Sequence, residues 1–587
     1  MTLFAGIYAR DPRLPPPAAA RDSLRRLLSR DRRDEPAVFD GGRAFLVKAD
    51  VGAYGEPAWR VDEGGAVSAL AGEPLLGAAG GGEGRRGRAE DLAELHGAWL
   101  AGDLDILRRA RGVFCAAHYS PAGGLTLAAD KLCVRPLYYW AGEKYVVFST
   151  ALRVLEGLDL VPKELDVRAV AEQVGLGVPL GTRTPYAGVS LLRAGEVLRF
   201  DGDAASAHRY WRWDDIAPSA RDEGELAREA YALFTEAVAR RARGDAATFA
   251  FLSGGLDSRA VVGALRAREL AVHTFNFSPA GSQDQVFGAG YARLAGTTHH
   301  EAPRRDEGGV DWSRMLADAW RAAREGEGLA AERPQLGWSG DGGSVGLGHV
   351  YVSAEIVALT REGRTGEAVE AFLRQQEAHV PERFLRPRAA AALSDVLRRG
   401  VREELESVGC PDPGRGFHLF LMLNDQRRHL ARHFENVDLH RLELQLPFYD
   451  SDFLSHVLSV PVELCLGHRF YHRFLAHFPP EVTSVPWQTY PGHEPCPVPA
   501  PEGLGYQWEG GGRAAPPRRR AVARQACALL GAGDFPRGIF SRGRVGLAAL
   551  AHLAGVRDYG YVLEAARTYR QYWALSGGRY RMPARDV

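Results

Sequence analysis

The sequence predicts a mixed α/β protein with two or more domains. The chain has 587 residues, which is too long for a single hydrophobic core. Its N-terminal part consists of short apolar runs broken by Gly and Pro, whereas apolar residues recur at helical spacing from Glu223 onward. A strand–helix–strand–helix–strand order then follows, which is typical of a parallel sheet with right-handed crossovers.

Short strands are expected throughout the N-terminal part. The clearest runs are 44–47, 112–119, 125–129 and 145–148, and residues 77–87 are expected to form a Gly-rich surface loop. These features favour a strand-rich domain over residues 1–212.

The parallel-sheet domain is expected over residues 223–498. Its expected elements are a helix from Glu223 to Arg243, strands at 248–252, 271–277 and 297–301, and helices at 257–265 and 283–295. A third part, 499–587, begins with Pro and Gly and is expected to contain helices near 546–553 and 561–572.

The string Ser-Gly-Gly-Leu-Asp-Ser at 253–258 connects an expected strand to an expected helix. Such a turn directs free backbone N–H groups outward, and the helix N-terminus adds partial positive charge. Gly254 and Gly255 allow an anion to approach the backbone closely. The expected ligand is the pyrophosphate of ATP, and Asp257 beside an anion implies Mg²⁺. The string is not a Walker loop, because no Lys follows its last Gly.

Composition excludes several classes of function. Lys plus Arg and Asp plus Glu both number 73, so no net charge favours nucleic acid or an anionic membrane. The six cysteines are scattered without a Cys-x-x-Cys pair, which argues against a disulfide framework or a zinc site. The start of the chain lacks signal-peptide features, and no apolar run is long enough to span a bilayer. A cytoplasmic protein is expected.

Three further strings accompany the loop. Residues 130–139 read Asp-Lys-Leu-Cys-Val-Arg-Pro-Leu-Tyr-Tyr, 339–344 read Ser-Gly-Asp-Gly-Gly-Ser, and 443–450 read Glu-Leu-Gln-Leu-Pro-Phe-Tyr-Asp. With the loop at 253–258, they resemble the motifs of the asparagine synthetase B family over residues 4–490. The resemblance implies an N-terminal class II glutaminase-like domain with the αββα sandwich of Ntn hydrolases. It also implies a C-terminal ATP pyrophosphatase domain with the parallel sheet of adenine nucleotide α-hydrolases.

The glutaminase half departs from the family pattern. The family opens Met-Cys-Gly-Ile and uses the Cys as nucleophile, but here Ala5 stands before Gly6-Ile7 and offers none. Thr2 would be three residues out of position. The family's Asn-Gly-Glu aligns with Ala71-Gly72-Glu73, so the amide donor for the oxyanion is also missing. We therefore expect no glutamine hydrolysis.

A synthetase without this ammonia source needs another amine. Within the family, the pattern resembles β-lactam synthetases, carbapenam synthetases and lasso-peptide cyclases, which join a carboxylate and an amine of one substrate. The resemblance implies an ATP-dependent, AMP-forming carbon–nitrogen ligase, with a lasso-type cyclase of a small peptide as the preferred case. The alternatives are an asparagine synthetase that uses free ammonia and a nucleotide-binding pseudoenzyme with a scaffolding role. A homodimer or a complex with a biosynthetic partner is left open.

The candidate site residues follow from the loop and from the resemblance. Nucleotide contacts are expected from Leu252, Ser253, Gly254, Gly255, Asp257, Ser258, Phe275, Asn276, Ser339 and Gly340, with strand 274–277 at the sheet edge. The candidate catalytic residues are Asp341 (base or amine-orienting group), Glu443, His468 and Arg469, and the candidate Mg²⁺ ligands are Asp257 and Ser344.

Several of these positions differ from the family. Ser344 stands where the family places a second Mg²⁺ carboxylate, and Gln445 replaces an Arg. His468 takes the place of a Lys that stabilises the adenylate, with Arg469 and Arg473 nearby as cations. Residues 299–301, His-His-Glu, are not expected to chelate a metal, because neighbouring side chains on a strand face opposite ways.

Overall fold

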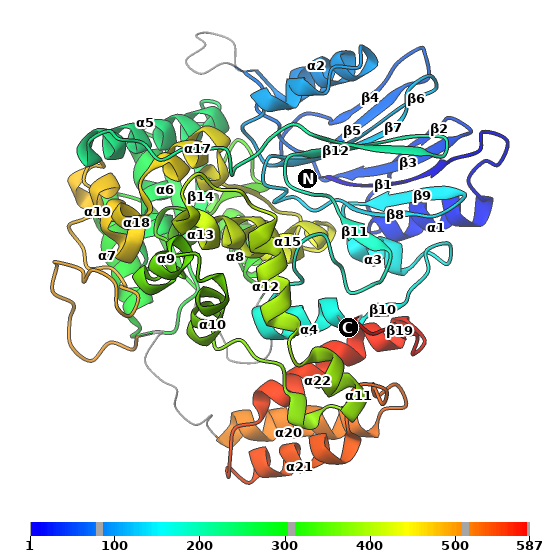
Figure 1. The fold of residues 1–587 in the computed structure, drawn as a ribbon. Helices are drawn as coiled ribbons and strands as arrows, with labels where there is room; N and C mark the ends of the chain where they lie inside the picture. Colours follow the sequence, from blue (N-terminus) through cyan, green and yellow to red (C-terminus); the bar gives the residue numbers. More distant parts are fainter. Residues whose placement is uncertain (1, 78–85, 303–310, 507–515, 584–587) are drawn as a thin grey trace.

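A computed structural model describes residues 2–77, 86–302, 311–506 and 516–583 (Figure 1). The N-terminal part contains two six-stranded antiparallel sheets. In spatial order, the first consists of β11 (Val189–Leu191), β8 (Tyr138–Ala141), β9 (Tyr145–Ser149), β1 (Thr2–Ala9), β3 (Ala44–Asp50) and β2 (Ala37–Asp40). The second consists of β13 (Ala204–Arg209), β12 (Glu196–Asp201), β7 (Gly124–Ala129), β6 (Phe114–Ser120), β5 (Val67–Gly72) and β4 (Trp59–Val61).

The two sheets pack face to face, and helices cover their outer faces. Ala5, Val47, Ala69 and Ala117 are buried in the shared core between the sheets. Helices α1 (Ala18–Leu28) and α3 (Leu152–Glu156) pack on the first sheet, and α2 (Arg88–Leu100) with η1 (Asp105–Arg109) packs on the second. This arrangement is the αββα sandwich that the family resemblance implied.

The second part is built on a five-stranded sheet whose neighbours are all parallel. Its order is β16 (Thr298–Glu301), β15 (Ala271–Asn276), β14 (Ala247–Phe251), β17 (Leu336–Trp338) and β18 (Glu443–Gln445). The first helices are α5 (Glu223–Ala242), α6 (Leu256–Arg266), α7 (Gln283–Ala295) and α8 (Trp312–Glu327). Strand β15 lies inside the sheet between β14 and β16, so its predicted place at the edge was wrong.

Further helical segments complete this part; many lie around the sheet in Figure 1, whereas the segment 382–393 lies beside the C-terminal helices at the bottom. In chain order they are η2 (Gly343–Leu347), α9 (Ala354–Arg361), α10 (Thr365–Gln375), η3 (Glu382–Phe384), α11 (Pro387–Leu393), α12 (Val396–Glu406), η4 (Pro413–Arg415), α13 (Gly416–Leu421), η5 (Met422–Gln426), α14 (Arg427–His429), α15 (Ala431–Glu435), α16 (Val437–His440), η6 (Pro447–Tyr449), α17 (Ser451–Ser459), α18 (Val462–Cys465), η7 (Leu466–His468), α19 (Arg469–Leu475) and η8 (Pro480–Val482). Segments η2 and η5 are π-helical turns, a feature that often accompanies functional sites.

The C-terminal helices lie at the bottom of Figure 1, in orange and red. They are α20 (Pro516–Gly531), α21 (Arg542–Leu553) and α22 (Gly560–Leu575), and the short β19 (Tyr580–Arg581) pairs in parallel with β10 (Leu165–Asp166). Helix α22 packs on α4 (Val167–Leu176) and shares the core of the first N-terminal sheet. The tail is therefore packed against the N-terminal half.

The structure confirms the strands and helices predicted on both sides of the 253–258 loop, and α21 and α22 in the tail. Helix α20 was not predicted, and residues 78–85 of the predicted Gly-rich loop lie outside the described residues. The boundaries at 212, 223 and 498 remain predictions. None of the described helices has the length and apolar character needed to cross a membrane.

Candidate active site at the loop after strand β14

The loop after β14 directs its backbone N–H groups toward nearby oxygens. The Ser253 N–H donates to Ser258 Oγ at 2.9 Å, and the Gly255 N–H donates to Ser253 Oγ at 3.2 Å. The Gly254 N–H donates to Asp284 Oδ1 at 2.6 Å. The Asp284 carboxylate thus already accepts a hydrogen bond from one of these N–H groups. This is the behaviour expected of an anion-binding loop at a helix N-terminus.

Two cavities adjoin this loop, and both are bordered by Ser253 and Asp284. After the ligands that the sequence predicts near this loop, we call them the nucleoside cavity (about 410 Å³) and the phosphate cavity (about 180 Å³). Apolar and aromatic side chains line much of the first: Phe251, Leu252, Phe275, Phe277, Trp312, Leu430 and Leu444. Polar groups dominate the second: Ser253, Asp257, Asp284, Ser344, His468, His472, Gln488, Thr489, Tyr490 and Glu494.

The structure brings most of the predicted nucleotide contacts to these two cavities. Leu252, Ser253, Phe275, Asn276 and Ser339 line the nucleoside cavity, and Ser253 and Gly255 line the phosphate cavity. The other three do not line either cavity. Ser258 Oγ accepts a hydrogen bond from the Ser253 N–H. A Cβ at Gly254 would lie 2.7 Å from Asp284 Cα, and a Cβ at Gly340 would lie 2.5 Å from Ser258 N. Gly254 and Gly340 are therefore required for close packing.

Asp257, at the start of α6, is held by three donors. Its Oδ2 accepts from the backbone N–H and the hydroxyl of Ser344, at 3.0 and 2.7 Å, and its Oδ1 accepts from the Tyr471 hydroxyl at 2.6 Å. Burial raises the pKa of Asp257 to about 6, although these hydrogen bonds act to lower it. The π-helical turn η2 positions Ser344 for this contact.

The donor set at Asp257 suits Mg²⁺ that is shared with phosphate groups. No group of three or more His, Cys, Asp or Glu side chains within the described residues could form a metal cage. Mg²⁺ prefers oxygen ligands, keeps several waters, and is commonly bound by one or two carboxylates together with substrate phosphates. Asp257 and Ser344 supply a carboxylate and a hydroxyl at the wall of the phosphate cavity, so the residues fit this mode.

Asp341 joins two side chains in the nucleoside cavity. Its Oδ2 accepts a short hydrogen bond from the Ser339 hydroxyl, and its Oδ1 lies 3.0 Å from His429 Nε2. Burial acts to raise the pKa of Asp341, but the hydrogen bond from His429 prevails and lowers it. The same hydrogen bond raises the pKa of His429 to about 9. At neutral pH the pair is therefore a carboxylate and an imidazolium, and Asp341 attracts an ammonium group better than it accepts a proton.

Glu443, a predicted catalytic residue, lies outside both cavities. Its Oε2 is 2.6 Å from Arg135 Nη2, and both side chains are buried between the N-terminal half and strand β18. Next to this pair, Gln445 Nε2 donates to Glu73 Oε2 at 3.2 Å, and Glu73 forms an ion pair with Arg243. The partner of Glu443 is thus an arginine from the other half of the chain, and its catalytic role stays a prediction.

The cation predicted near His468 is also corrected. His468 does line the phosphate cavity, but burial and the neighbouring His493 lower its pKa to about 3, so the imidazole is neutral. Its ring stacks on Tyr490, with ring centroids 5.4 Å apart. Arg469 donates to the Glu463 carbonyl, and Arg473 lies 3.8 Å from Glu223; both are exposed and outside the cavity.

Sequence reasoning missed three side chains that shape the site: His429, Asp284 and Tyr471. Asp284 lies on α7, 30 residues after Gly254 in the chain, and Tyr471 lies on α19, more than 200 residues after Asp257. Their positions depend on tertiary packing. In the sequence, His429 was marked only by its place at the end of the basic run Arg427-Arg428-His429.

The region equivalent to a glutaminase site contains no activated nucleophile among its described residues. Ala5 is buried in the middle of β1, paired with Val47 and Ser149. The nearby thiols are also inert, because burial raises the pKa of Cys115 well above its ordinary value and that of Cys133 to about 11.

Comparison with known proteins agrees with this two-part architecture. Residues 88–211 match the family model of a glutamine amidotransferase domain, and residues 229–328 match that of asparagine synthase. A putative asparagine synthetase of Methanocaldococcus jannaschii is 31% identical over 190 residues, which is 31% of this chain and 37% of that protein. Asparagine synthetase 3 of Bacillus subtilis is 27% identical over 179 residues, or 30% of this chain and 28% of that protein.

A putative asparagine synthetase of Mycobacterium tuberculosis is 28% identical over 237 residues, or 36% of each chain. This chain therefore spans about a third of the length of the curated relatives it matches. Among solved structures, glutamine phosphoribosylpyrophosphate amidotransferase from B. subtilis matches 52% of this chain and 81% of its own, at 13% identity and a TM-score of 0.23.

The fold and the site together define a protein with an amidotransferase-like N-terminal half followed by an α/β domain whose phosphate-binding-type loop reads Ser-Gly-Gly-Leu-Asp-Ser. The two matched family models, in this order along the chain, and the curated relatives support an asparagine synthetase B-like family.

Proposed function

We propose that the protein is an ATP-dependent ligase that activates a carboxylate as its adenylate and then forms an amide, releasing AMP and pyrophosphate. One observation carries the proposal: Ser253 and its loop lie between a largely apolar cavity of about 410 Å³ and a polar cavity of about 180 Å³ that contains Asp257. The first has the size and character of a nucleoside site, and the second adjoins the loop where phosphates are expected.

In this proposal the chain's own groups position ATP. The adenine and ribose lie among Phe275, Asn276 and Ser339, the loop N–H groups donate to the phosphates, and Asp257 with Ser344 holds Mg²⁺. When bound, Mg²⁺ neutralises charge on the departing pyrophosphate. The substrate carboxylate bonds to the α-phosphorus while the bond to pyrophosphate breaks. Preorganised donors at the loop then stabilise the charge that develops.

Asp341 and His429 serve the amine in the second step. The lowered pKa of Asp341 makes it an orienting group for the substrate ammonium, and His429, with a pKa of about 9, is protonated at neutral pH and keeps Asp341 ionised. The ammonium first loses a proton to water; the amine nitrogen then bonds to the acyl carbon, AMP leaves with the bonding electron pair, and the nitrogen loses a second proton to water. This assignment prefers the orienting role of Asp341 over the role of base.

The amine is proposed to come from the substrate and not from glutamine. Glu73, Arg135 and Gln445 lie between the N-terminal half and strand β18, where ammonia from a glutaminase site could cross. The cavity at these residues measures only about 10 Å³, and buried polar contacts cross it. The specific case we propose resembles lasso-peptide cyclases, in which the carboxylate and the amine belong to one peptide.

Glutamine hydrolysis is expected to be absent. Incubation with glutamine should release no glutamate above a buffer control, because Ala5 carries no nucleophile and burial keeps the Cys115 and Cys133 thiols protonated. Glutamate can be measured with a coupled dehydrogenase assay. Glutamate release that disappears in Thr2→Ala would instead show that the N-terminal residue has replaced the cysteine.

Pyrophosphate exchange into ATP tests the proposal directly, using a panel of carboxylates and short peptides as substrates. The exchange should require Mg²⁺ and should fall about tenfold between pH 7 and pH 5, because protonation of Asp257 near pH 6 removes a metal ligand. His429, whose pKa is about 9, stays protonated between pH 7 and pH 5, so it does not contribute to this fall.

Asp257→Asn is the matched control for that pH profile. It should lower exchange at every pH and remove the fall between pH 7 and pH 5, with an unchanged circular dichroism spectrum. If Asp257→Asn keeps both the exchange rate and its pH dependence, the loop assignment fails.

A nucleotide-binding pseudoenzyme is the second candidate, and one observation favours it. The described lining of the phosphate cavity contains three carboxylates (Asp257, Asp284 and Glu494) and neither Lys nor Arg. In addition, both oxygens of Asp257 already accept internal hydrogen bonds. Mg-ATP binding without exchange on any carboxylate would support this reading. Exchange with aspartate and product formation with ammonia would instead identify an asparagine synthetase.

The domain limits proposed for this enzyme are 1–212, 223–498 and 499–587, with cytoplasmic location. ATP and a carboxylate–amine substrate, a small peptide in the preferred case, are its proposed partners.

A further inference from the structure

A further cavity, of about 730 Å³, lies outside the site described so far. Its walls come from the N-terminal half, from the segment 177–185, from helices α14 and α15, and from Tyr572 on α22. The volume falls within the range of roughly 300–1,000 Å³ typical of ligand sites. We call it the interdomain cavity, because three parts of the fold meet there.

The interdomain cavity and the nucleoside cavity share a wall. His429 and Leu430 line the nucleoside cavity, Arg428 and Ala431 line the interdomain cavity, and Arg432 lines both. The side chain of Arg432 is exposed and has no hydrogen-bond or ion-pair partner among the described side chains. A ligand that reaches past Arg432 would therefore touch both cavities.

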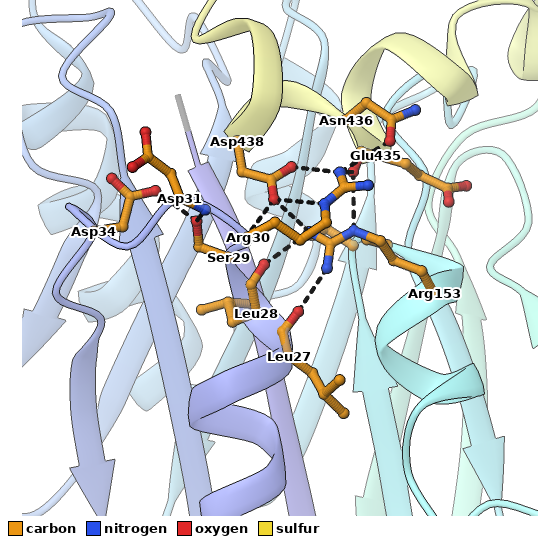
Figure 2. Close-up of polar contacts among 12 residues, drawn as sticks. Leu27, Leu28, Ser29, Arg30, Asp31, Asp34, Arg153, Glu435, Asn436 and Asp438 are labelled. Carbon is orange, nitrogen blue, oxygen red and sulfur yellow. Dashed lines mark hydrogen bonds and ion pairs between the residues drawn. The ribbon is translucent and has the colours of Figure 1, made fainter.

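Several charged groups around the interdomain cavity are already committed to one another (Figure 2). Arg30 and Arg153 both contact Asp438, at 2.7 and 3.1 Å, and Arg30 also donates to Asn436 Oδ1 at 2.9 Å. Arg153 in addition donates to backbone carbonyls of α1. These contacts fix one wall of the cavity, and the single carboxylate of Asp438 offsets part of the two guanidinium charges.

The remaining groups offer both donors and acceptors. Glu435 and Glu156 each accept a tyrosine hydroxyl; the second oxygen of Glu435 also accepts the Leu152 N–H, whereas Glu156 has a second carboxylate oxygen to offer. Burial raises the pKa of both, that of Glu435 to about 7. Gln173 donates to the Tyr572 hydroxyl, while its buried Oε1 has no partner among the described residues. Arg432 contributes free N–H donors.

This mixture favours a peptide over a phosphorylated or polyanionic ligand. A peptide presents N–H and C=O groups in alternation and so needs both acceptors and donors. Of the four arginines that line the cavity, Arg30, Arg153 and Arg428 already bind Asp438 or backbone carbonyls. A phosphate would therefore find only Arg432 uncommitted and would face two carboxyl groups.

We propose that the interdomain cavity binds a segment of a peptide substrate whose reacting end lies in the nucleoside cavity beside Asp341. This inference rests on the proposed ligase function, and it names the substrate class and the place where that substrate is held. Arg432 lies where the peptide passes from one cavity to the other.

The test uses the full chain and an equimolar library of random hexapeptides, with retained peptides identified by mass spectrometry. Ala431→Trp places an indole in the interdomain cavity, and Ala358→Trp, at an exposed position of α9, is the matched control. Wild type and Ala358→Trp should retain the same peptides, and Ala431→Trp should retain at least tenfold less. No retention by wild type, or equal retention by Ala431→Trp, overturns the inference.

A second measurement does not depend on how the variant folds. The same library carrying one benzoylphenylalanine should, on irradiation, label wild type at residues 177–179, 431–432 or 571–572, and labelling confined to other sites contradicts the proposal. Mg-ATP binding, measured by calorimetry, should be unchanged in Ala431→Trp. Peptide retention without any Mg-ATP binding would contradict the ligase function but support the peptide site. The failure of one proposal can therefore be distinguished from the failure of the other.

Discussion

Arg135→Met is expected to lower the free energy of unfolding by about 3–5 kcal/mol, because it leaves the Glu443 carboxylate buried without its cation. Arg135 and Glu443 are 2% and 0% exposed, and the ion pair between them measures 2.6 Å. The Arg135 guanidinium also lies 4.2 Å from the ring centre of Phe434, a cation–π contact that Met would lose. Urea unfolding followed by tryptophan fluorescence measures the change.

The double variant Arg135→Met/Glu443→Leu is the control for this prediction. Replacing both partners by apolar residues removes the uncompensated charge, and such replacements are often neutral. In the wild type, Glu443 Oε1 and Arg135 Nε have no hydrogen-bond partner among the described residues, which also limits what the pair contributes. We expect the double variant to recover most of the lost stability.

The same variants decide between two roles for Glu443. As an interdomain group, Glu443 should affect unfolding strongly and pyrophosphate exchange only through folding. If Glu443→Gln abolished exchange while leaving the unfolding curve unchanged, Glu443 would be catalytic, as its motif predicted, and the interdomain role would be wrong.

The loop and its flanking elements could be predicted because their signals are local. An apolar run, two glycines and a helical pattern within about twenty residues specify a strand, a phosphate-binding turn and a helix N-terminus. The partners of the site residues could not be predicted in this way. Glu443 meets Arg135 across 308 residues, and Asp341 meets His429 across 88, so only the tertiary fold brings them together.

The role expected at His468 illustrates a different limit. A motif supplies a position but not its electrostatics. His468 has a positive φ of 65° and is stacked on two tyrosine rings, and burial leaves it neutral. A Lys at the same place would face the same desolvation. Among the described residues, no Lys or Arg lines the phosphate cavity, and the sequence alone could not show this.

Ser344→Asp is expected to tighten Mg²⁺ binding by about ten- to a hundredfold, which corresponds to about 1–3 kcal/mol for an added favourable carboxylate contact. The Ser344 hydroxyl lies 2.7 Å from Asp257 Oδ2, so the new carboxylate would face the existing one across a distance that a divalent cation can bridge. Pyrophosphate exchange measured against Mg²⁺ concentration gives the half-saturation.

Without Mg²⁺, Ser344→Asp should be less stable than the natural protein, because two carboxylates so close together cannot both ionise freely. Ser344→Asn is the matched control: it has nearly the size of Asp and no charge, and it should gain no Mg²⁺ affinity. Equal half-saturation in both variants would mean that this position does not touch the metal.

If Asp341→Ala then weakened the Mg²⁺ dependence, Asp341 would be the second metal ligand, and its role as the amine-orienting group would have to be abandoned. If no variant exchanged pyrophosphate with any carboxylate, the pseudoenzyme would become the better description. In that case the hydrogen bond from Ser344 would occupy the Asp257 carboxylate in place of Mg²⁺.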